Sequence, residues 1–133
     1  GIGFGQTISA PHMHAHALEY LLPVIKKRHA KLLDIGCGSG YLTAVMARMN
    51  PTAKVYGVDN IPELVSISEK NILKQDGDLL PDRIKLHAHD GWKGWMDYAP
   101  YDGIHVGAAA PVIPTALLEQ LKVDGIMIIP IGR

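Results

Sequence analysis

Short apolar runs alternate along the chain with stretches in which apolar residues recur every three or four positions. The runs predict strands at residues 31–35, 54–59, 83–89, 101–106 and 125–130. The stretches between them predict helices. Because the strand runs are apolar on both faces and alternate with helices, we expect an α/β fold with a doubly wound, mostly parallel sheet covered on both sides.

The expected helices have recognisable starts and ends. The first begins after Ser9, which suits an N-cap, and we expect Pro23 to kink or interrupt it near Leu22. The other helices are expected from Gly40 or Tyr41 to Met49, from Pro62 to Lys74 and from Thr115 to Lys122. The apolar residues expected to face inward are Met13, Ala17, Leu21, Leu22, Ile25, Leu64, Val65, Ile67, Ile72, Leu73, Leu117, Leu118 and Leu121.

Length and composition limit the class of protein. The 133 residues suffice for one domain and are too few for two, so we expect a single domain over residues 1–133. The formal net charge is zero, which does not favour nucleic acid as a partner. No apolar run approaches the roughly 20 residues of a membrane span, and the one cysteine, Cys37, fits a reducing compartment. We expect a cytoplasmic monomer with neither nucleic acid nor membrane as partner, and we interpret the chain as part of a longer protein.

The turn after the first predicted strand carries the most chemical information. It comprises residues 34–40, DIGCGSG, and leads into a predicted helix. Glycines at such a turn permit positive φ and let a ligand approach the bare backbone. A dinucleotide-binding turn places pyrophosphate there, but a carboxylate two residues ahead of the glycines repels phosphate and suits a cationic ligand. S-adenosylmethionine has a sulfonium, an ammonium and no phosphate, and the spacing of Asp34, Gly36, Gly38 and Gly40 resembles the first motif of the methyltransferases that use it.

Polar residues also follow the ends of other predicted strands, where ligands bind in sheets of this kind. Asp59 stands 19 residues beyond Gly40, close to the spacing at which a carboxylate accepts hydrogen bonds from ribose hydroxyls. Asp90 can accept a hydrogen bond from an adenine amine. Each could instead be a solvated aspartate in a turn. The candidate cofactor-binding residues from these strand ends are Asp34, Gly36, Gly38, Ser39, Asp59, Asn60, Asp90 and Gly91.

Two further stretches complete a recognisable pattern. Residues 2–13, IGFGQTISAPHM, precede the glycine turn, and residues 101–111, YDGIHVGAAAP, follow it. Together with the glycine turn they resemble the protein-L-isoaspartate (D-aspartate) O-methyltransferase family over nearly the whole chain. The departures are mild: Gly5 precedes Gln6 where the family usually has glutamine followed by another residue, and residues 122–125 read KVDG in place of the usual KPGG. An N-terminal helical segment and two further C-terminal strands of the family are absent from this sequence.

The resemblance implies S-adenosylmethionine as cofactor, with S-adenosylhomocysteine as product. The implied substrate is the free carboxylate of L-isoaspartyl or D-aspartyl residues in damaged proteins and peptides. Esterification lets the neighbouring backbone nitrogen close a succinimide, which reopens partly to normal aspartate. The implied catalytic residue is Ser9, whose hydroxyl would hold the substrate carboxylate, although Ser9 could also be a plain N-cap. Gln6, Thr7 and Ile8 would close over the cofactor, and His14 would lie near it.

The exit from the fourth predicted strand agrees with a carboxylate nucleophile. Amine methylation often uses an Asn/Asp-Pro-Pro-aromatic element at this point, whereas residues 107–110 of this chain read GAAA. A carboxylate, with a pKa of about 4, is already ionised at neutral pH and needs no base. The enzyme then mainly has to align the nucleophile with the methyl group.

Three other functions stay open. The chain could methylate another protein or a small molecule with the same cofactor. It could be a nicotinamide-dependent oxidoreductase, which predicts an anion at the glycine turn. It could also be a non-catalytic sensor of an adenosyl ligand.

The remaining histidines and tryptophans carry weaker signals. His12 and His16 stand four apart on the first predicted helix, but only Glu19 stands near enough to complete a metal site, so we expect no metal. His87 and His89 alternate on a predicted strand and are expected in the core or at an edge. Trp92 and Trp95 could cover the adenine or pack in the core.

Overall fold

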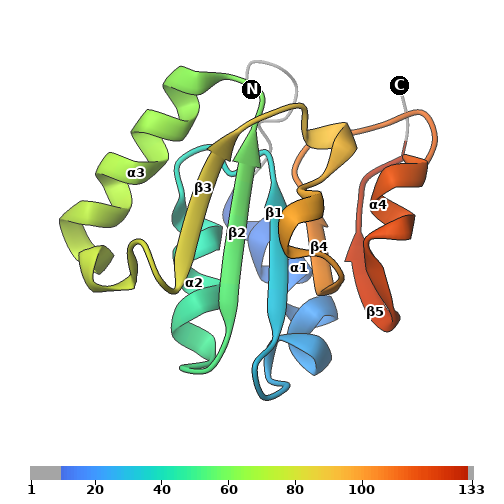
Figure 1. The fold of residues 1–133 in the computed structure, drawn as a ribbon, viewed down its shortest axis with the longest axis horizontal. Coiled ribbons are helices and arrows are strands. Elements are labelled where there is room, and N and C mark those ends of the chain that lie inside the picture. Colours follow the sequence, from blue (N-terminus) through green and yellow to red (C-terminus); the bar gives the residue numbers. More distant parts are fainter. Residues whose placement is uncertain (1–9, 132–133) are drawn as a thin grey trace.

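The computed structural model describes residues 10–131 as a five-stranded parallel sheet with helices on both faces (Figure 1). The strand order is β3-β2-β1-β4-β5, so the chain winds outward in both directions from β1. The strands are β1 (Lys31–Ile35), β2 (Lys54–Asp59), β3 (Ile84–Ala88), β4 (Tyr101–Val106) and β5 (Leu121–Ile128). The helices are α1 (Ala10–Ile25), α2 (Tyr41–Met49), α3 (Pro62–Asp76) and α4 (Thr115–Glu119), with short 3-10 turns η1 (Gly77–Leu79), η2 (Gly91–Lys93) and η3 (Met96–Tyr98). The predicted α/β class and doubly wound sheet are confirmed.

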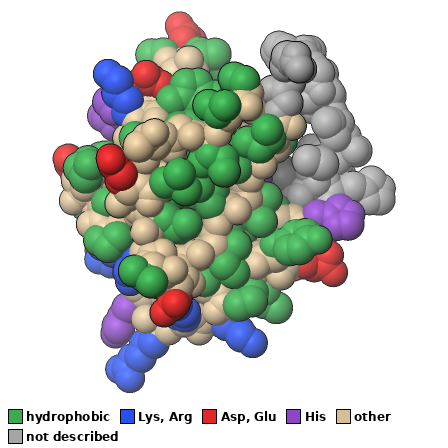
Figure 2. All heavy atoms as spheres, turned by 90° about the vertical axis from the view of Figure 1, so that its right-hand side faces the viewer, with side chains coloured by type: hydrophobic (Ala, Val, Ile, Leu, Met, Phe, Trp, Pro, Cys, Tyr) green, Lys and Arg blue, Asp and Glu red, His purple; other side chains and the backbone are tan. Residues whose placement is uncertain are grey.

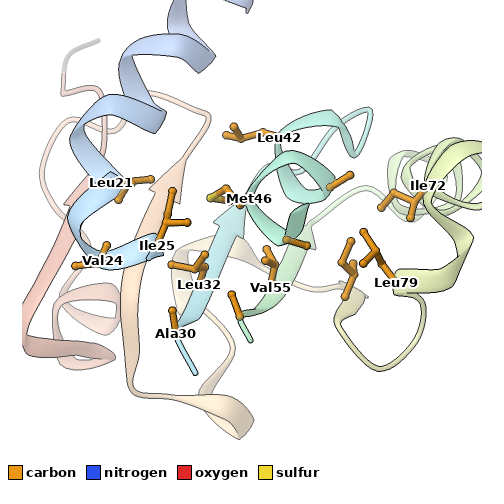
Figure 3. Packing of buried hydrophobic residues seen from close by; sticks show 14 residues of the cluster. Leu21, Val24, Ile25, Ala30, Leu32, Leu42, Met46, Val55, Ile72 and Leu79 are labelled. Atoms are coloured by element: carbon orange, nitrogen blue, oxygen red, sulfur yellow. The ribbon is translucent and has the colours of Figure 1, made fainter. Parts of the chain in front are cut away.

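The central strand β1 is buried on both faces because its alternate residues enter two different cores. Leu32 packs with Leu21 of α1 and Ile72 of α3 in the core under the three long helices (Figure 3). Leu33 packs on the opposite face with Leu117 of α4. Burial of each of these leucines stabilises the folded state by about 1.5–3 kcal/mol relative to leaving the side chain exposed. The turn that leaves β1 is therefore anchored at a rigid strand.

The outer side of β5 is apolar and partly open. Figure 2 views the molecule from the α4 and β5 side, where hydrophobic side chains gather. Val123 of β5 is fully exposed, and Val112 in the loop before α4 and Leu118 on α4 are also exposed. Apolar surface of this kind is typical of contact surfaces.

Helix α1 runs through Pro23 to Ile25, so Pro23 does not interrupt the helix near Leu22, while the alternative expectation of a kink stays a prediction. Proline removes one backbone donor and crowds the preceding turn. Pro23 lies on the exposed side of α1, where water can satisfy the carbonyl that loses its donor.

Among residues 10–131, no helix has both the length and the apolar character to cross a membrane.

The predicted helix from Thr115 to Lys122 ends earlier, at Glu119, and β5 begins at Leu121 rather than at residue 125. The cause is Gln120, whose side chain is buried. It accepts a hydrogen bond from the Trp95 backbone at 3.0 Å and donates one to the Lys93 carbonyl at 2.8 Å. These bonds fix the chain at this point and direct it into the sheet.

Some of the inward faces were predicted wrongly. Ile67 and Leu73 of α3 are 47% and 58% exposed, and Leu22 and Leu118 are exposed on their own helices. The buried positions of α3 are Ile72, as predicted, and Ser68, a polar residue. Helical periodicity counts apolar residues, so it misses a buried polar side chain that has hydrogen-bond partners.

Candidate functional site

The carboxyl ends of the strands are joined directly by backbone hydrogen bonds, which bring the predicted site residues to one edge of the sheet (Figure 1). The Gly36 amide donates to the Val58 carbonyl of β2 at 2.6 Å, and the Gly107 amide donates to the Ile35 carbonyl of β1 at 2.8 Å. His89, just after β3, donates to the Asp59 carbonyl at 2.9 Å. The ends of β3, β2, β1 and β4 therefore form one continuous rim.

The glycine turn has a backbone that only glycine adopts easily. Gly36, Gly38 and Gly40 have φ of 78°, 55° and 85°. Among the described residues, the nearest atoms to a Cβ built on Gly36 belong to the Gly107 backbone at 3.9 Å, and the nearest to one on Gly38 is the Gly36 carbonyl oxygen at 3.8 Å. No side chain of residues 15–131 comes within 4 Å of either Cβ position, apart from those of the chain neighbours. This bare backbone at the head of α2 fits a ligand that approaches the main chain closely.

The Asp34 carboxylate is buried, with 1% of the residue exposed, and both of its oxygens have partners within the protein. Oδ1 lies 2.9 Å from Nδ1 of His105 on β4, and Oδ2 accepts the hydroxyl of Thr43 on α2 at 2.7 Å. These contacts tie together β1, β4 and α2 immediately below the glycine turn. Direct contact between Asp34 and a cofactor stays a prediction, whereas its contacts with His105 and Thr43 support the turn.

Asp59 ends β2 with its side chain at the rim. The residue is 6% exposed, and its Oδ1 accepts the backbone N–H of Ile61 at 3.1 Å, which starts α3. A carboxylate is an acceptor through two oxygens, so this bond does not exhaust its capacity. Asn60, beside it, is exposed. The position fits the predicted role of Asp59 toward ribose hydroxyls.

Asp90 and Gly91 lie beyond the end of β3. Asp90 is exposed, and its Oδ1 accepts the Trp92 amide at 3.0 Å as the N-cap of η2. A Cβ atom on Gly91 would lie 2.6 Å from Cγ2 of Ile35, so the chain passes tightly against the end of β1. Both the turn function and the predicted contact with adenine are compatible with this placement, and the second stays a prediction.

The exit loop of β4 presents small apolar side chains beside the glycine turn. Ala108 and Ala109 are exposed, while Ala110 is buried and its amide donates to the Pro130 carbonyl at 3.1 Å. No residue from 107 to 111 carries a polar side chain. The side chains of this loop are therefore small and provide no general base.

Cys37, inside the glycine turn, is packed away from the rim. Burial raises the pKa of its thiol to about 12, and its Sγ lies 3.5 Å from the Ser68 hydroxyl. A nucleophilic cysteine requires the opposite, a lowered pKa and access. Cys37 is therefore a packing residue.

The predicted aromatic cover is divided between core and surface. Trp95 packs against Tyr56 at a ring distance of 5.8 Å and stacks on His87 at 4.8 Å, whereas Trp92 is 39% exposed. His87 and His89 are exposed at the edge formed by β3, and their rings stack at 5.2 Å. Of the two placements expected for these histidines, core or edge, the structure shows the edge.

Part of the predicted site lies outside the described residues. Gln6, Thr7, Ile8 and Ser9 precede residue 10, and for His14 only its place on α1 is described. The roles assigned to these residues stay predictions.

Sequence reasoning missed four side chains that hold the site: Thr43, Ser68, Asn71 and His105. His105 could have been found, because parallel pairing of β1 with β4 places it opposite Asp34. The other three lie on helices, and no local pattern indicates which turn their side chains reach.

Comparisons with known proteins agree with this geometry. A family model described as protein-L-isoaspartate(D-aspartate) O-methyltransferase (PCMT) matches residues 1–133. The chain is similar to the protein-L-isoaspartate O-methyltransferase of Triticum aestivum, with 51% identity over 98% of this chain and 58% of that protein. It is similar to protein-L-isoaspartate O-methyltransferase 1 of Arabidopsis thaliana, with 50% identity over 99% of this chain and 58% of that protein.

A solved structure extends the similarity to three dimensions. It is a crystal structure from Plasmodium falciparum, described as a protein-L-isoaspartate O-methyltransferase in complex with S-adenosyl-L-homocysteine. Its TM-score is 0.86 at 37% identity, over 97% of this chain and 63% of that chain. The chain thus spans less than two thirds of the length of these relatives.

Proposed function

Because the chain belongs to the protein-L-isoaspartate(D-aspartate) O-methyltransferase family, we propose that the protein methylates the free carboxylate of L-isoaspartyl and D-aspartyl residues in damaged proteins and peptides, using S-adenosylmethionine. The observation that carries the proposal is the shared rim of the bare glycine turn, Asp59 and the alanine exit loop. The rim combines a bare backbone turn, a carboxylate that can accept ribose hydroxyls and an exit loop of small side chains, beside which the peptide would bind. The product ester would close to a succinimide, which returns part of the damaged residues to aspartate.

The residues at the rim fit the chemistry of the cofactor. The bare backbone at Gly36 and Gly38 would hold its amino-acid part. Asp59 would accept the two ribose hydroxyls, and Asp90 the adenine amine. S-adenosylmethionine supplies a methyl group already activated by a sulfonium.

The task of the chain is then to bind and orient the two reactants. Holding a nucleophile in line with a reacting carbon can lower the barrier by about 7–11 kcal/mol. The substrate carboxylate is ionised at neutral pH, so the lack of a polar side chain in residues 107–111 does not impede the reaction. Ser9 would orient that carboxylate by donating its hydroxyl.

The proposal extends to the setting of the protein. We place it in the cytoplasm as a monomer, with isoaspartyl proteins and peptides as partners and without nucleic acid or membrane, and residues 1–133 as a single cofactor-binding domain. The zero net charge and the single, buried cysteine support this assignment.

Transfer of a labelled methyl group tests the reaction. The protein is incubated with methyl-labelled S-adenosylmethionine and an isoaspartyl peptide, and its aspartyl twin serves as control. We expect label in the isoaspartyl peptide alone. Equal labelling of both peptides, or labelling of neither, would overturn the proposed substrate.

Calorimetry separates the proposal from the remaining alternatives. We expect S-adenosylhomocysteine to bind and NAD not to bind. Binding of NAD instead would indicate an oxidoreductase. Binding of S-adenosylhomocysteine without transfer to any peptide or small molecule would indicate a sensor.

A further inference from the structure

Helix α3 holds the glycine turn from the side through two side-chain hydrogen bonds. The Ser68 hydroxyl donates to the Gly38 carbonyl, and Nδ2 of Asn71 donates to the Ser39 carbonyl at 3.0 Å. Ser68 is fully buried, whereas Asn71 is exposed. Two consecutive carbonyls of the turn are thereby fixed by residues one helical turn apart.

Close packing reinforces these bonds. A Cβ atom on Gly40 would lie 3.0 Å from the Ser68 carbonyl and 3.1 Å from Cδ1 of Ile72. The end of the turn therefore rests directly on α3, with no space for a side chain between them. A shift of the turn toward α3 is blocked, and a shift away from it breaks the two hydrogen bonds.

The same helix is fixed at its other end to the second part of the site. Asp59 accepts the amide of Ile61, and α3 begins at the next residue, Pro62. One helix of 15 residues thus joins Asp59 to the carbonyls of the glycine turn. Proteins bind a ligand more tightly when the binding segment is already ordered, because the entropy of that segment is then lost during folding and not during binding.

We infer that Ser68 and Asn71 are positioning residues for the cofactor site. They hold the glycine turn in register with Asp59, so that the two parts of the site face the ligand in a fixed arrangement before it binds. The inference rests on the proposed use of S-adenosylmethionine. In it, Ser68 and Asn71 act on the cofactor site through the glycine turn and not through contact with the cofactor.

The test compares two matched changes on α3. Asn71→Asp turns the donor into an acceptor that repels the Ser39 carbonyl, with almost no change in shape. Gln75→Glu makes the same amide-to-carboxylate change one turn further along. Gln75 is exposed and, like Asn71, lines a groove between α2 and α3. Ser68→Ala is the second test variant, because it removes the buried donor without adding a charge.

The first readout is the affinity for S-adenosylhomocysteine, measured by calorimetry on the whole protein. We expect Asn71→Asp and Ser68→Ala each to weaken binding roughly three- to tenfold, as for the loss of one hydrogen bond, and Gln75→Glu to stay within about twofold. The second readout is amide hydrogen exchange of the ligand-free protein. We expect the Gly40 amide to exchange faster in both test variants and at the parent rate in Gln75→Glu.

The outcomes separate the inference from the function on which it rests. If the parent protein does not bind S-adenosylhomocysteine, the proposed function fails, and the exchange data alone decide whether α3 holds the turn. If the parent binds and both test variants keep its affinity and its exchange rate at Gly40, the positioning role is wrong. Loss of affinity with an unchanged exchange rate at Gly40 would also overturn it, because the weaker binding would then have a cause other than a less ordered turn.

Discussion

Nδ1 of His105 lies 2.9 Å from Oδ1 of Asp34, which joins the ends of β4 and β1 beneath the glycine turn. The second carboxylate oxygen accepts the Thr43 hydroxyl from α2 at 2.7 Å. Each of the two carboxylate oxygens therefore has a side-chain partner from a different element. Asp34 thus acts as a buried junction of three elements, and this arrangement explains why a carboxylate can stand at the start of the turn without facing solvent.

The first prediction concerns the Thr43 side of this junction. Thr43→Val keeps the shape of the side chain and removes the donor, leaving one buried oxygen of Asp34 unpaired. We expect the free energy of unfolding to fall by about 1.5–3 kcal/mol, the range for hydrogen bonds to charged groups. Urea denaturation measures the change. Thr115→Val, at an exposed position, should change stability by no more than about 0.5 kcal/mol, and equal effects of the two changes would contradict the junction.

A second prediction follows from the backbone of the turn. Gly40→Ala places a Cβ where φ is 85° and where the Ser68 carbonyl lies 3.0 Å away. We expect a loss of stability beyond the roughly 1–2 kcal/mol that the left-handed conformation alone costs. Gly77→Ala is the control, because φ there is −59° and the nearest atom lies at 3.7 Å. Thermal melting should show the Gly77→Ala variant unchanged or slightly stabilised. A similar change in the melting temperature of both variants would contradict the prediction, because the backbone and the contacts at Gly40 would then impose no special cost.

The arrangement of the strand ends at the rim could be predicted from the hydrophobic pattern of the sequence. Strands apolar on both faces define a parallel sheet, and parallel strands place all their carboxyl ends at one edge. That is why Asp59, Asp90 and the glycine turn could be assigned to one site from their positions after predicted strands. Their placement at the rim is what the structure adds to this assignment.

The supporting side chains could not be predicted in the same way. Ser68 and Asn71 reach the turn from α3 across about 30 positions of sequence, and this contact depends on how the helix lies against the sheet. The buried amide of Gln120 likewise ends α4 through bonds to residues 93 and 95. Hydrophobic periodicity carries no information about such long-range polar contacts, and it therefore extended α4 too far and placed Leu73 inside.

The third prediction concerns Cys37. Burial raises the pKa of its thiol to about 12, so the thiol stays protonated between pH 7 and about pH 9, where an ordinary cysteine begins to ionise. We expect alkylation by iodoacetamide to be slow over this range in the folded protein and fast once the protein is unfolded in urea. An alkylation rate that rises through about pH 8 in the folded protein, as for a free thiol, would show that Cys37 is accessible and ionisable.

Asp59 gives the fourth prediction, because its carboxylate accepts the Ile61 amide and, in the proposed function, also accepts the ribose hydroxyls. Asp59→Asn keeps an oxygen that can accept the Ile61 amide but loses the charge, whereas Asp59→Ala loses both. We expect Asp59→Ala to weaken S-adenosylhomocysteine binding by roughly 1–3 kcal/mol and Asp59→Asn to weaken it less while preserving stability. Calorimetry and thermal melting measure the two effects, with the exposed Asp124→Ala as control. An unchanged dissociation constant in Asp59→Ala would reduce Asp59 to a residue that starts α3.

The last prediction concerns Ser9, which immediately precedes α1 and lies outside the described residues. Its hydroxyl can cap the helix or orient the substrate carboxylate, and the two roles have different consequences. A pure N-cap replaced by alanine lowers stability by about 1 kcal/mol and leaves turnover of the folded protein intact. A positioning hydroxyl affects turnover far more, since misplacing a nucleophile by about 1 Å can cost on the order of a hundredfold in rate. We expect Ser9→Ala to keep its affinity for S-adenosylhomocysteine and to lose most of its methyl transfer to an isoaspartyl peptide.

Paired measurements on Ser9→Ala distinguish these roles. Thermal melting reports the cap, and single-turnover methyl transfer at saturating cofactor reports the alignment of the substrate. Ser66→Ala, at an exposed position on α3, is the matched control and should leave both unchanged. If Ser9→Ala melts a few degrees lower and still transfers methyl groups at the parent rate, Ser9 is an N-cap and the alignment of the carboxylate must come from another residue.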